Sequence, residues 1–292
     1  MDDLPDKILK KCGGIPLAII AMAILLAGKQ RDQWFDVYGS ISFSHKGNPQ
    51  VQNTMTILAF SYYDMPFHLR TCLLYLGVFP EDYIIDKDQL IWMWIAEGFV
   101  HANPQGPGEL FELGEAYFNE LMNRSMIQPV EYDFGHGIIV GCRLHDMVLG
   151  LIRSLSREEN FVTIFGDEHN ALPEGQVHKL SFQKRTVGNI PRVQMGIPRI
   201  RSLVCWCSIF QMVSITSFCL LRVLFLEDYL KTDRIQCDLK HLGDLHHLRY
   251  LGLKHTGICK LPEEIGCLKF LETLDLNDNF NLTELPMTIG LL

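Results

Sequence analysis

The stretch "LRYLGLKHTGICKLPEEIGCLKFLETLDLNDNFNLTELPMTIG", residues 248–290, contains the same pattern twice. Leucines occupy the first, fourth and sixth positions of 248–253 and of 271–276, and each copy continues with a Leu-Pro and an Ile-Gly pair. An earlier copy, "LRVLFL", begins at Leu221, and the copies are 27 and 23 residues apart. A period of roughly 20–29 residues with this leucine spacing is typical of leucine-rich repeats. We therefore expect short parallel strands whose leucines face inward and whose alternate side chains line a concave face.

Working outward, a weaker unit, "IRSLVCW", begins at Ile200. A linker-like stretch, "GDEHNALPEGQ", separates the repeat region from what precedes it. At the other end the array reaches Leu292 without a polar terminal unit, which predicts that the sequence is truncated there.

The N-terminal part contains an apolar run of 13 residues, Ile15 to Ala27. The run is too short to span a bilayer, which takes roughly 20 residues. Three aspartates cancel three lysines before it, so a buried helix is favoured over a secretory signal. Pro16 suits the first turn of that helix, where no backbone N–H is needed. Nine scattered cysteines in the chain indicate reduced thiols in a cytosolic protein.

Residues 61–160 carry most of the acidity, with six basic and fifteen acidic side chains in a chain of net charge −8. Three helix patterns, a hairpin pattern around a glycine-rich turn and a closing helix from Met147 to about Leu155 resemble a winged-helix arrangement. The negative charge argues against contact with a nucleic acid backbone. Trp92 and Trp94 have helical spacing and apolar neighbours, so core packing is favoured over a base-stacking platform.

Several segments together resemble one family. They are "CGGIPLAI" (12–19), "LRTCLLYLGVFPEDYIIDKDQLIWMWIAEGFV" (69–100), "CRLHDMV" (142–148) and the repeats, in the order found in plant NB-ARC leucine-rich-repeat disease resistance proteins of the coiled-coil class. The sequence contains no Gly-x-x-x-x-Gly-Lys-Ser/Thr loop, and Gly28-Lys29 is followed by Gln30. The resemblance therefore implies a fragment that lacks the phosphate-loop subdomain.

The resemblance also implies a multidomain, mainly α fold that ends in an α/β solenoid. The expected parts are a helical domain remnant of NB-ARC (1–62, with a Gly-Leu-Pro-Leu-Ala-type motif at 14–18), a winged-helix domain (63–160, with a Met-His-Asp-type motif at 144–146), a linker (161–195) and the truncated leucine-rich repeats (196–292).

In such a family member, ADP binds between the domains at rest, and exchange for ATP follows pathogen detection and triggers cell death. The implied partners are a pathogen effector or guarded host protein on the repeats, together with the receptor's own nucleotide-binding and coiled-coil domains. The implied location is cytoplasmic, including a peripheral position at the plasma membrane. We expect no transmembrane segment and no tightly bound nucleotide in this fragment, because the phosphate loop is missing.

His145 is, by resemblance, the motif histidine that contacts the β-phosphate of ADP, and a histidine can donate to a phosphate oxygen. Leu144 stands where the family has methionine. From the residues alone, His145 and Asp146 start the helix from Met147, with Asp146 as its cap. For the fragment by itself, the helix-start role is favoured.

Pro16 is, by resemblance, packed against the adenine side of the nucleotide, with Gly14 and Leu17 among the surrounding residues. Ile15 stands where the family has leucine. Without the resemblance, this stretch is an ordinary helix start.

A stand-alone protein-binding module without a nucleotide switch is the alternative function. No motif with the spacing of a catalytic site occurs, so we expect no enzymatic activity. Zinc is disfavoured because the candidate ligands lack a Cys-x-x-Cys spacing; they are Cys205, Cys207, Cys219, His241, His246 and His247.

Overall fold

The computed structural model describes residues 4–40, 49–101, 107–132, 137–165, 177–183, 199–206, 218–227, 239 and 241–292. The chain forms two compact units, neither continuous in sequence. The first contains Met1–Leu76, Glu81–Lys87 and Glu115–Leu155, and the second contains Gly77–Pro80, Asp88–Gly114 and Ser156–Leu292. The winged-helix part of the sequence is therefore shared between the two units.

Four helices open the first unit: α1 (Leu4–Lys11), α2 (Pro16–Ala27), α3 (Gln33–Ser40) and α4 (Pro49–Tyr63). The apolar run predicted to be a buried helix is α2, and Pro16 is its first residue. Its buried side chains recur at helical spacing from Leu17 to Leu26 and pack next to α4, which buries Ile57 and Leu58. Across the described residues, the helices are too short or too polar to cross a membrane.

The winged-helix elements follow: α5 (Phe67–Tyr75), the 3-10 turn η2 (Leu76–Val78), β1 (Ile85–Asp86), α6 (Lys87–Glu97), α7 (Pro107–Asn123), β2 (Gln128–Glu131), β3 (Ile139–Arg143) and α8 (Asp146–Glu158). The strands form an antiparallel sheet in the order β1-β3-β2. The predicted hairpin and closing helix are confirmed. Trp94 is completely buried and Trp92 is partly buried against Phe111, so the prediction of core packing is confirmed as well.

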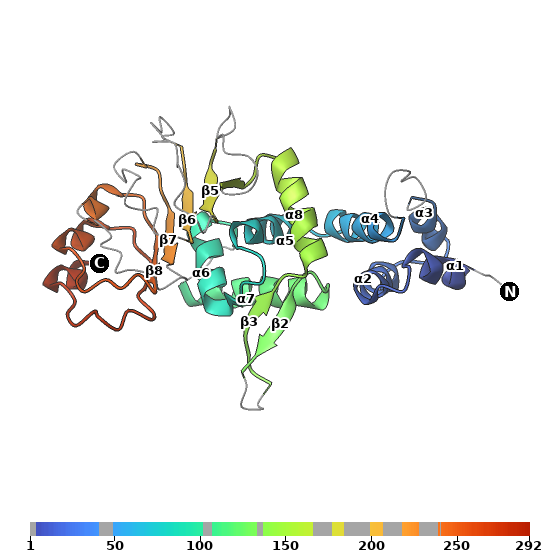
Figure 1. The fold of residues 1–292 in the computed structure, drawn as a ribbon, viewed down its shortest axis with the longest axis horizontal. Coiled ribbons are helices and arrows are strands. Elements are labelled where there is room, and N and C mark those ends of the chain that lie inside the picture. The colour runs from blue at the N-terminus through green and yellow to red at the C-terminus, as the bar shows by residue number, and fades with distance from the viewer. Residues whose placement is uncertain are drawn as a thin grey trace. The chain divides into compact units, whose positions relative to one another are not determined.

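Six parallel strands form the sheet of the repeat region, in sequence order (Figure 1). They are β4 (Thr163–Phe165), β5 (Lys179–Phe182), β6 (Ser202–Cys205), β7 (Val223–Glu227), β8 (Tyr250–Lys254) and β9 (Thr273–Asp275), and the turns η5 (Leu242–Asp244), η6 (Glu263–Cys267) and η7 (Met287–Leu291) come between or after them. Val223, Tyr250 and Thr273 pair in register, so equivalent positions of successive repeats stand side by side.

The strands β4 and β5 correct one prediction, because both lie in 161–195, which was predicted to be a linker. Residues 166–176, which carry the linker-like composition, and 184–198 lie outside the described part of the chain.

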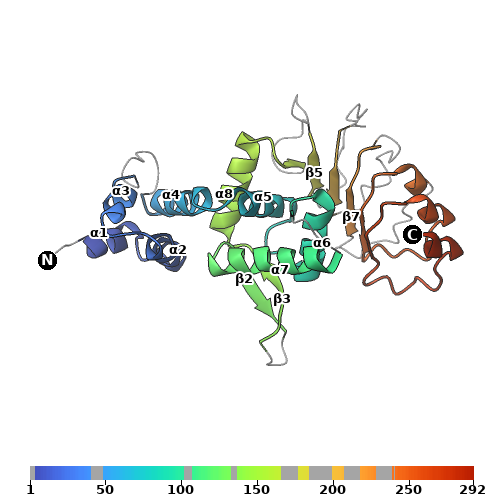
Figure 2. The same cartoon turned by 180° about the vertical axis from the view of Figure 1, so that it is seen from behind.

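The two faces of the repeat sheet differ in composition. One face packs the repeat leucines into a continuous core with the residues of the turns, and this core includes Leu203, Leu224, Leu251 and Leu253. Because side chains alternate along a strand, the residues between these leucines point to the other side. We call that side the second face; it carries Lys179, Ser181, Ser202, Val204, Trp206, Val223, Phe225, Tyr250 and Gly252. Figure 2 shows the strands of this sheet from behind.

Candidate functional site

The Gly14–Ala18 motif forms the turn into α2. Gly14 has a positive φ of 75°, a conformation that glycine adopts without strain, and Ile15 takes the extended N-cap conformation. Pro16 is exposed, whereas Leu17 and Ala18 point into the buried side of the helix. Of the predicted nucleotide contacts in this motif, Gly14 and Pro16 are accessible, and Leu17 is used mainly in packing.

His145 is the residue immediately before α8 and is partly buried. Its ring Nδ1 accepts a hydrogen bond from the backbone N–H of Met147 at 3.2 Å, and its carbonyl accepts from Val148 and Leu149. The prediction that Asp146 is the cap is therefore wrong. His145 supplies the capping acceptor, while Asp146 is the first helical residue, where a carboxylate favours the positive end of the helix.

The capping bond also fixes which ring nitrogen of His145 carries the proton. An Nδ1 that accepts a hydrogen bond is unprotonated, so in the neutral ring the proton is on Nε2. In the part of the chain that the structure describes, Nε2 has no hydrogen-bond partner. The ring can therefore start the helix and still present an N–H donor to an anionic oxygen. The two roles foreseen for His145 are compatible.

The structure does not join the two predicted contact regions directly. Pro16 opens α2 and His145 precedes α8, and within the described residues no hydrogen bond or ion pair links them. Both residues belong to the first unit. Their shared role in nucleotide binding stays a prediction.

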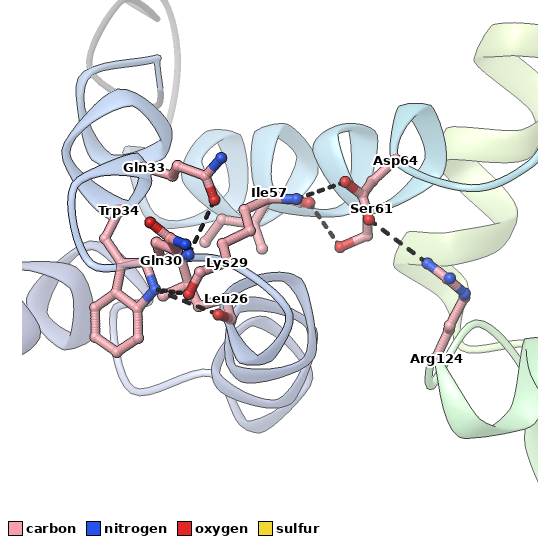
Figure 3. A network of polar contacts seen from close by, with 9 residues as sticks. All are labelled: Leu26, Lys29, Gln30, Gln33, Trp34, Ile57, Ser61, Asp64 and Arg124. Atoms are coloured by element: carbon pink, nitrogen blue, oxygen red, sulfur yellow. Dashed lines mark hydrogen bonds and ion pairs between the residues drawn. The ribbon is translucent and has the colours of Figure 1, made fainter.

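A charged cavity that the sequence did not reveal lies in the first unit, with a volume of about 320 Å³. Ile24, Leu25 and Gly28 from the end of α2 line it, together with Lys29, Asp64, Glu120, Asn123 and Arg124. Figure 3 shows Asp64 between Lys29 and Arg124. Lys29 Nζ lies 2.6 Å from one carboxylate oxygen of Asp64, and Arg124 Nη1 lies 3.7 Å from the other.

The charges around this cavity satisfy one another. Arg124 also donates from Nε to Glu120 at 2.8 Å, so two cations face two carboxylates. Gly28 and Lys29 follow the C-terminal end of α2, where backbone carbonyls rather than N–H groups are free. A phosphate needs the opposite helix end, so the cavity does not resemble a phosphate loop. Its chemistry is that of a partly exposed ion-pair network.

The face of the repeats that we expected to be open for recognition is largely closed. Every residue of β5, β6 and β7 is buried, including the polar Ser181, Ser202 and Glu227. Partial exposure begins at Lys254 in β8 and extends over β9. The accessible part of this face therefore belongs to the later strands.

The described cysteines form no disulfides with one another, and several of them are buried. Burial raises the pKa of Cys72, and burial together with the nearby Asp86 carboxylate raises that of Cys142 to about 12. Both thiols therefore stay protonated and behave as small apolar groups. Of the residues considered for zinc, Cys207 lies outside the described residues; among those described, no group of three or more histidine, cysteine or acidic side chains is arranged to hold a metal ion.

Two family models match the chain. The winged-helix domain of disease resistance proteins matches residues 78–152, and a leucine-rich repeat region matches residues 199–292. The first match contains His145 and the hairpin, and the second contains β6 to β9.

Similar proteins were found in several plants. The disease resistance protein Pik-2 of Oryza sativa subsp. japonica is 34% identical over 99% of this chain and 28% of its own length. The disease resistance protein RGA5 of the same species is 33% identical over 100% of this chain and 27% of its own length. A putative disease resistance RPP13-like protein 3 of Arabidopsis thaliana is 33% identical over 95% of this chain and 33% of its own length.

The chain thus spans about a third or less of the length of these relatives. The similarity nevertheless covers nearly all of this chain, including the N-terminal helices, the winged helix and the repeats. The two domain matches and the identity over nearly the whole chain place this sequence in the family of plant disease resistance proteins with a winged helix and leucine-rich repeats.

Proposed function

We propose that this chain is part of a plant immune receptor that is switched by ADP and ATP. The observation that carries the proposal is the geometry of His145, whose Nδ1 accepts the capping hydrogen bond while Nε2 has no hydrogen-bond partner among the described residues. In the complete receptor this donor contacts the β-phosphate of ADP, and Gly14 and Pro16 contact the adenine side. The contact favours the ADP-bound resting state.

The repeats take the recognition role in this proposal. They continue as a solenoid whose accessible face binds a pathogen effector or a guarded host protein. Lys254 at the end of β8 and the partly exposed residues of β9 support this assignment, because a protein can reach them. Before recognition, the repeats hold the receptor in its resting state in the cytoplasm or at the surface of the plasma membrane.

Substitution of His145 separates its two roles. In His145→Ala both the cap and the nucleotide donor are lost, whereas in His145→Asn the side-chain oxygen can replace Nδ1 as the capping acceptor. The proposal predicts that both variants of the complete receptor cause cell death without a pathogen when expressed in leaves. If His145→Asn is as silent as the unmodified receptor and only His145→Ala signals, the histidine acts as a helix cap and the nucleotide role is wrong.

The second candidate is a protein-binding module without a nucleotide switch. The observation in its favour is the cavity of the first unit, whose lysine and arginine are already neutralised by Asp64 and Glu120. Calorimetric titration of the purified chain with ADP would show no heat of binding under this alternative. The complete receptor, once its bound nucleotide has been removed, must show binding in the same titration if the first proposal holds.

A further inference from the structure

Part of the second face of β5 to β7 lies against a short segment of the winged-helix sequence. This segment, Gly77–Pro80, belongs to the same compact unit as the repeat strands. It consists of the end of η2 and the two residues after it, and Val78 and Phe79 have no exposed surface. A turn that is buried in this way needs partners for its backbone carbonyls, because an unsatisfied buried carbonyl is costly.

Three side chains of the repeat region donate to the Val78 carbonyl. The Ser181 hydroxyl donates at 2.6 Å, the Trp206 indole N–H at 2.9 Å and the Gln183 amide at 3.1 Å. Gln183 also donates to the Gly77 carbonyl at 3.3 Å. These donors come from two successive strands and the residues that follow them, so they are brought together only by the parallel register of β5 and β6.

Aromatic packing continues the contact along the second face. The ring of Phe79 lies 5.6 Å from that of Trp206, and Trp206 lies 5.2 Å from Phe225, measured between centroids. Such tilted pairs are favourable geometries for aromatic rings. The Phe225 ring in turn occupies the space over Gly252, where a Cβ atom would come within 2.5 Å of it. The row of rings therefore extends from the turn over β6 and β7 and ends above Gly252 of β8.

A second polar contact lies at the end of α6. The Ser202 hydroxyl donates to the carboxylate of Glu97, and Arg222 Nη1 donates to the Glu97 carbonyl at 3.3 Å. Ser202 and Glu97 are both buried. Ser181 and Ser202 are small hydroxyl residues at positions of the second face where a larger side chain would keep the winged-helix segment away.

We infer that Ser181, Gln183 and Trp206 are positioning residues that form a carbonyl clamp, and that this clamp makes the second face of β5 to β7 an internal docking groove for Gly77–Pro80. The groove unites the first repeats and this turn in one cooperative unit. It also makes the second face of these three strands inaccessible to other proteins, so that a protein partner binds to the strands from β8 onward. The inference stands independently of nucleotide binding, because every contact lies within this chain.

Hydrogen exchange of the whole chain, followed by mass spectrometry, tests the clamp. Trp206→Phe removes the indole donor and keeps an aromatic ring, so the amides of Val78 and Phe79 are expected to exchange at least tenfold faster. Trp94→Phe is the matched control, since Trp94 is also buried in the same unit but its indole nitrogen has no hydrogen-bond partner in the described part of the chain. In this control, exchange in the turn is expected to stay as in the unmodified chain.

Ser181→Ala gives an independent measurement with almost no change in volume, in case Trp206→Phe does not fold. Loss of the shortest hydrogen bond of the clamp is expected to accelerate exchange at Val78 and Phe79 several-fold, while α2, in the other unit, is unaffected. The inference is overturned if the turn exchanges at the unmodified rate in Ser181→Ala, or if Trp206→Phe and Trp94→Phe accelerate it equally.

Discussion

At the scale of single residues, Lys179 is an unusual member of the second face because it is a buried lysine. Its Nζ lies 3.9 Å from the ring centroid of Phe161 and 5.4 Å from that of Phe99. Burial lowers the pKa of Lys179 from its usual 10.5, Arg201 and Arg222 lower it further, and Glu97 opposes the shift. The two rings offer a favourable but partial replacement for lost hydration.

This lowered pKa predicts how stability depends on pH. Between the lowered pKa and 10.5 the unfolded chain binds more protons than the folded chain, so the free energy of unfolding rises with pH in that window, by at most about 1.4 kcal/mol per pH unit. Lys179→Met is expected to remove this increase and to be at least as stable as the unmodified chain at pH 7. Urea unfolding at pH 7, 8, 9 and 10 measures both; a slope that persists in Lys179→Met would contradict the assignment.

Some residues of the site could be found from the sequence and others could not. Gly14, Pro16 and His145 stood out because they occur in short contiguous motifs, and the helix-start geometry expected for Pro16 and His145 is what the structure shows. Lys29 and Asp64 are 35 residues apart in the sequence, and Ser181 and Val78 are 103 residues apart. Neither pair has a sequence signature, because such contacts depend on tertiary packing rather than on local spacing.

At the scale of secondary structure, β3 and β1 pair closely because Gly141 has no side chain at the point where the backbones meet. A Cβ atom on Gly141 would lie 2.3 Å from the Ile85 carbonyl oxygen, which belongs to the backbone and has no room to move aside. Gly141→Ala is therefore expected to destabilise the small sheet by about 1–3 kcal/mol. The measurement is the urea unfolding midpoint together with hydrogen exchange in β1 and β3.

Gly150→Ala is the control for that substitution. Gly150 lies within α8, and a Cβ there would meet nothing within 4 Å. Alanine is favoured over glycine inside a helix by about 1 kcal/mol, so this variant should be slightly more stable. Equal destabilisation by both substitutions would show that loss of glycine, rather than the approach to Ile85, causes the effect.

The elements with a strong local pattern were predicted correctly, and the weaker unit from Ile200 contains β6, but β4 and β5 were missed. The apolar periodicity predicted α2, the hairpin pattern predicted β2 and β3, and the leucine spacing predicted β7 to β9. The strands β4 and β5 were assigned to a linker because "TIF" and "KLSF" are short and lack the full leucine pattern. Their pairing with β6 is non-local, and single-sequence patterns carry little information about it.

At the scale of the whole molecule, the boundaries of the compact units differ from the boundaries of the sequence motifs. The winged-helix match covers residues 78–152, yet Gly77–Pro80 and Asp88–Gly114 belong to the unit that contains the repeats. The clamp on Val78 gives a physical reason for this division. Because the turn Gly77–Pro80 docks on the first repeat strands, a structural change in the repeats acts directly on the turn, and the reverse.

The most direct test of the proposed switch is the nucleotide content of the complete receptor that carries this sequence. The purified protein is denatured, and the released nucleotides are separated and quantified. We expect about one ADP per chain in the unmodified receptor and a large loss in His145→Asn, which keeps the helix cap but not the Nε2 donor. An unmodified receptor that releases no ADP, or a His145→Asn variant that retains it fully, would contradict the account.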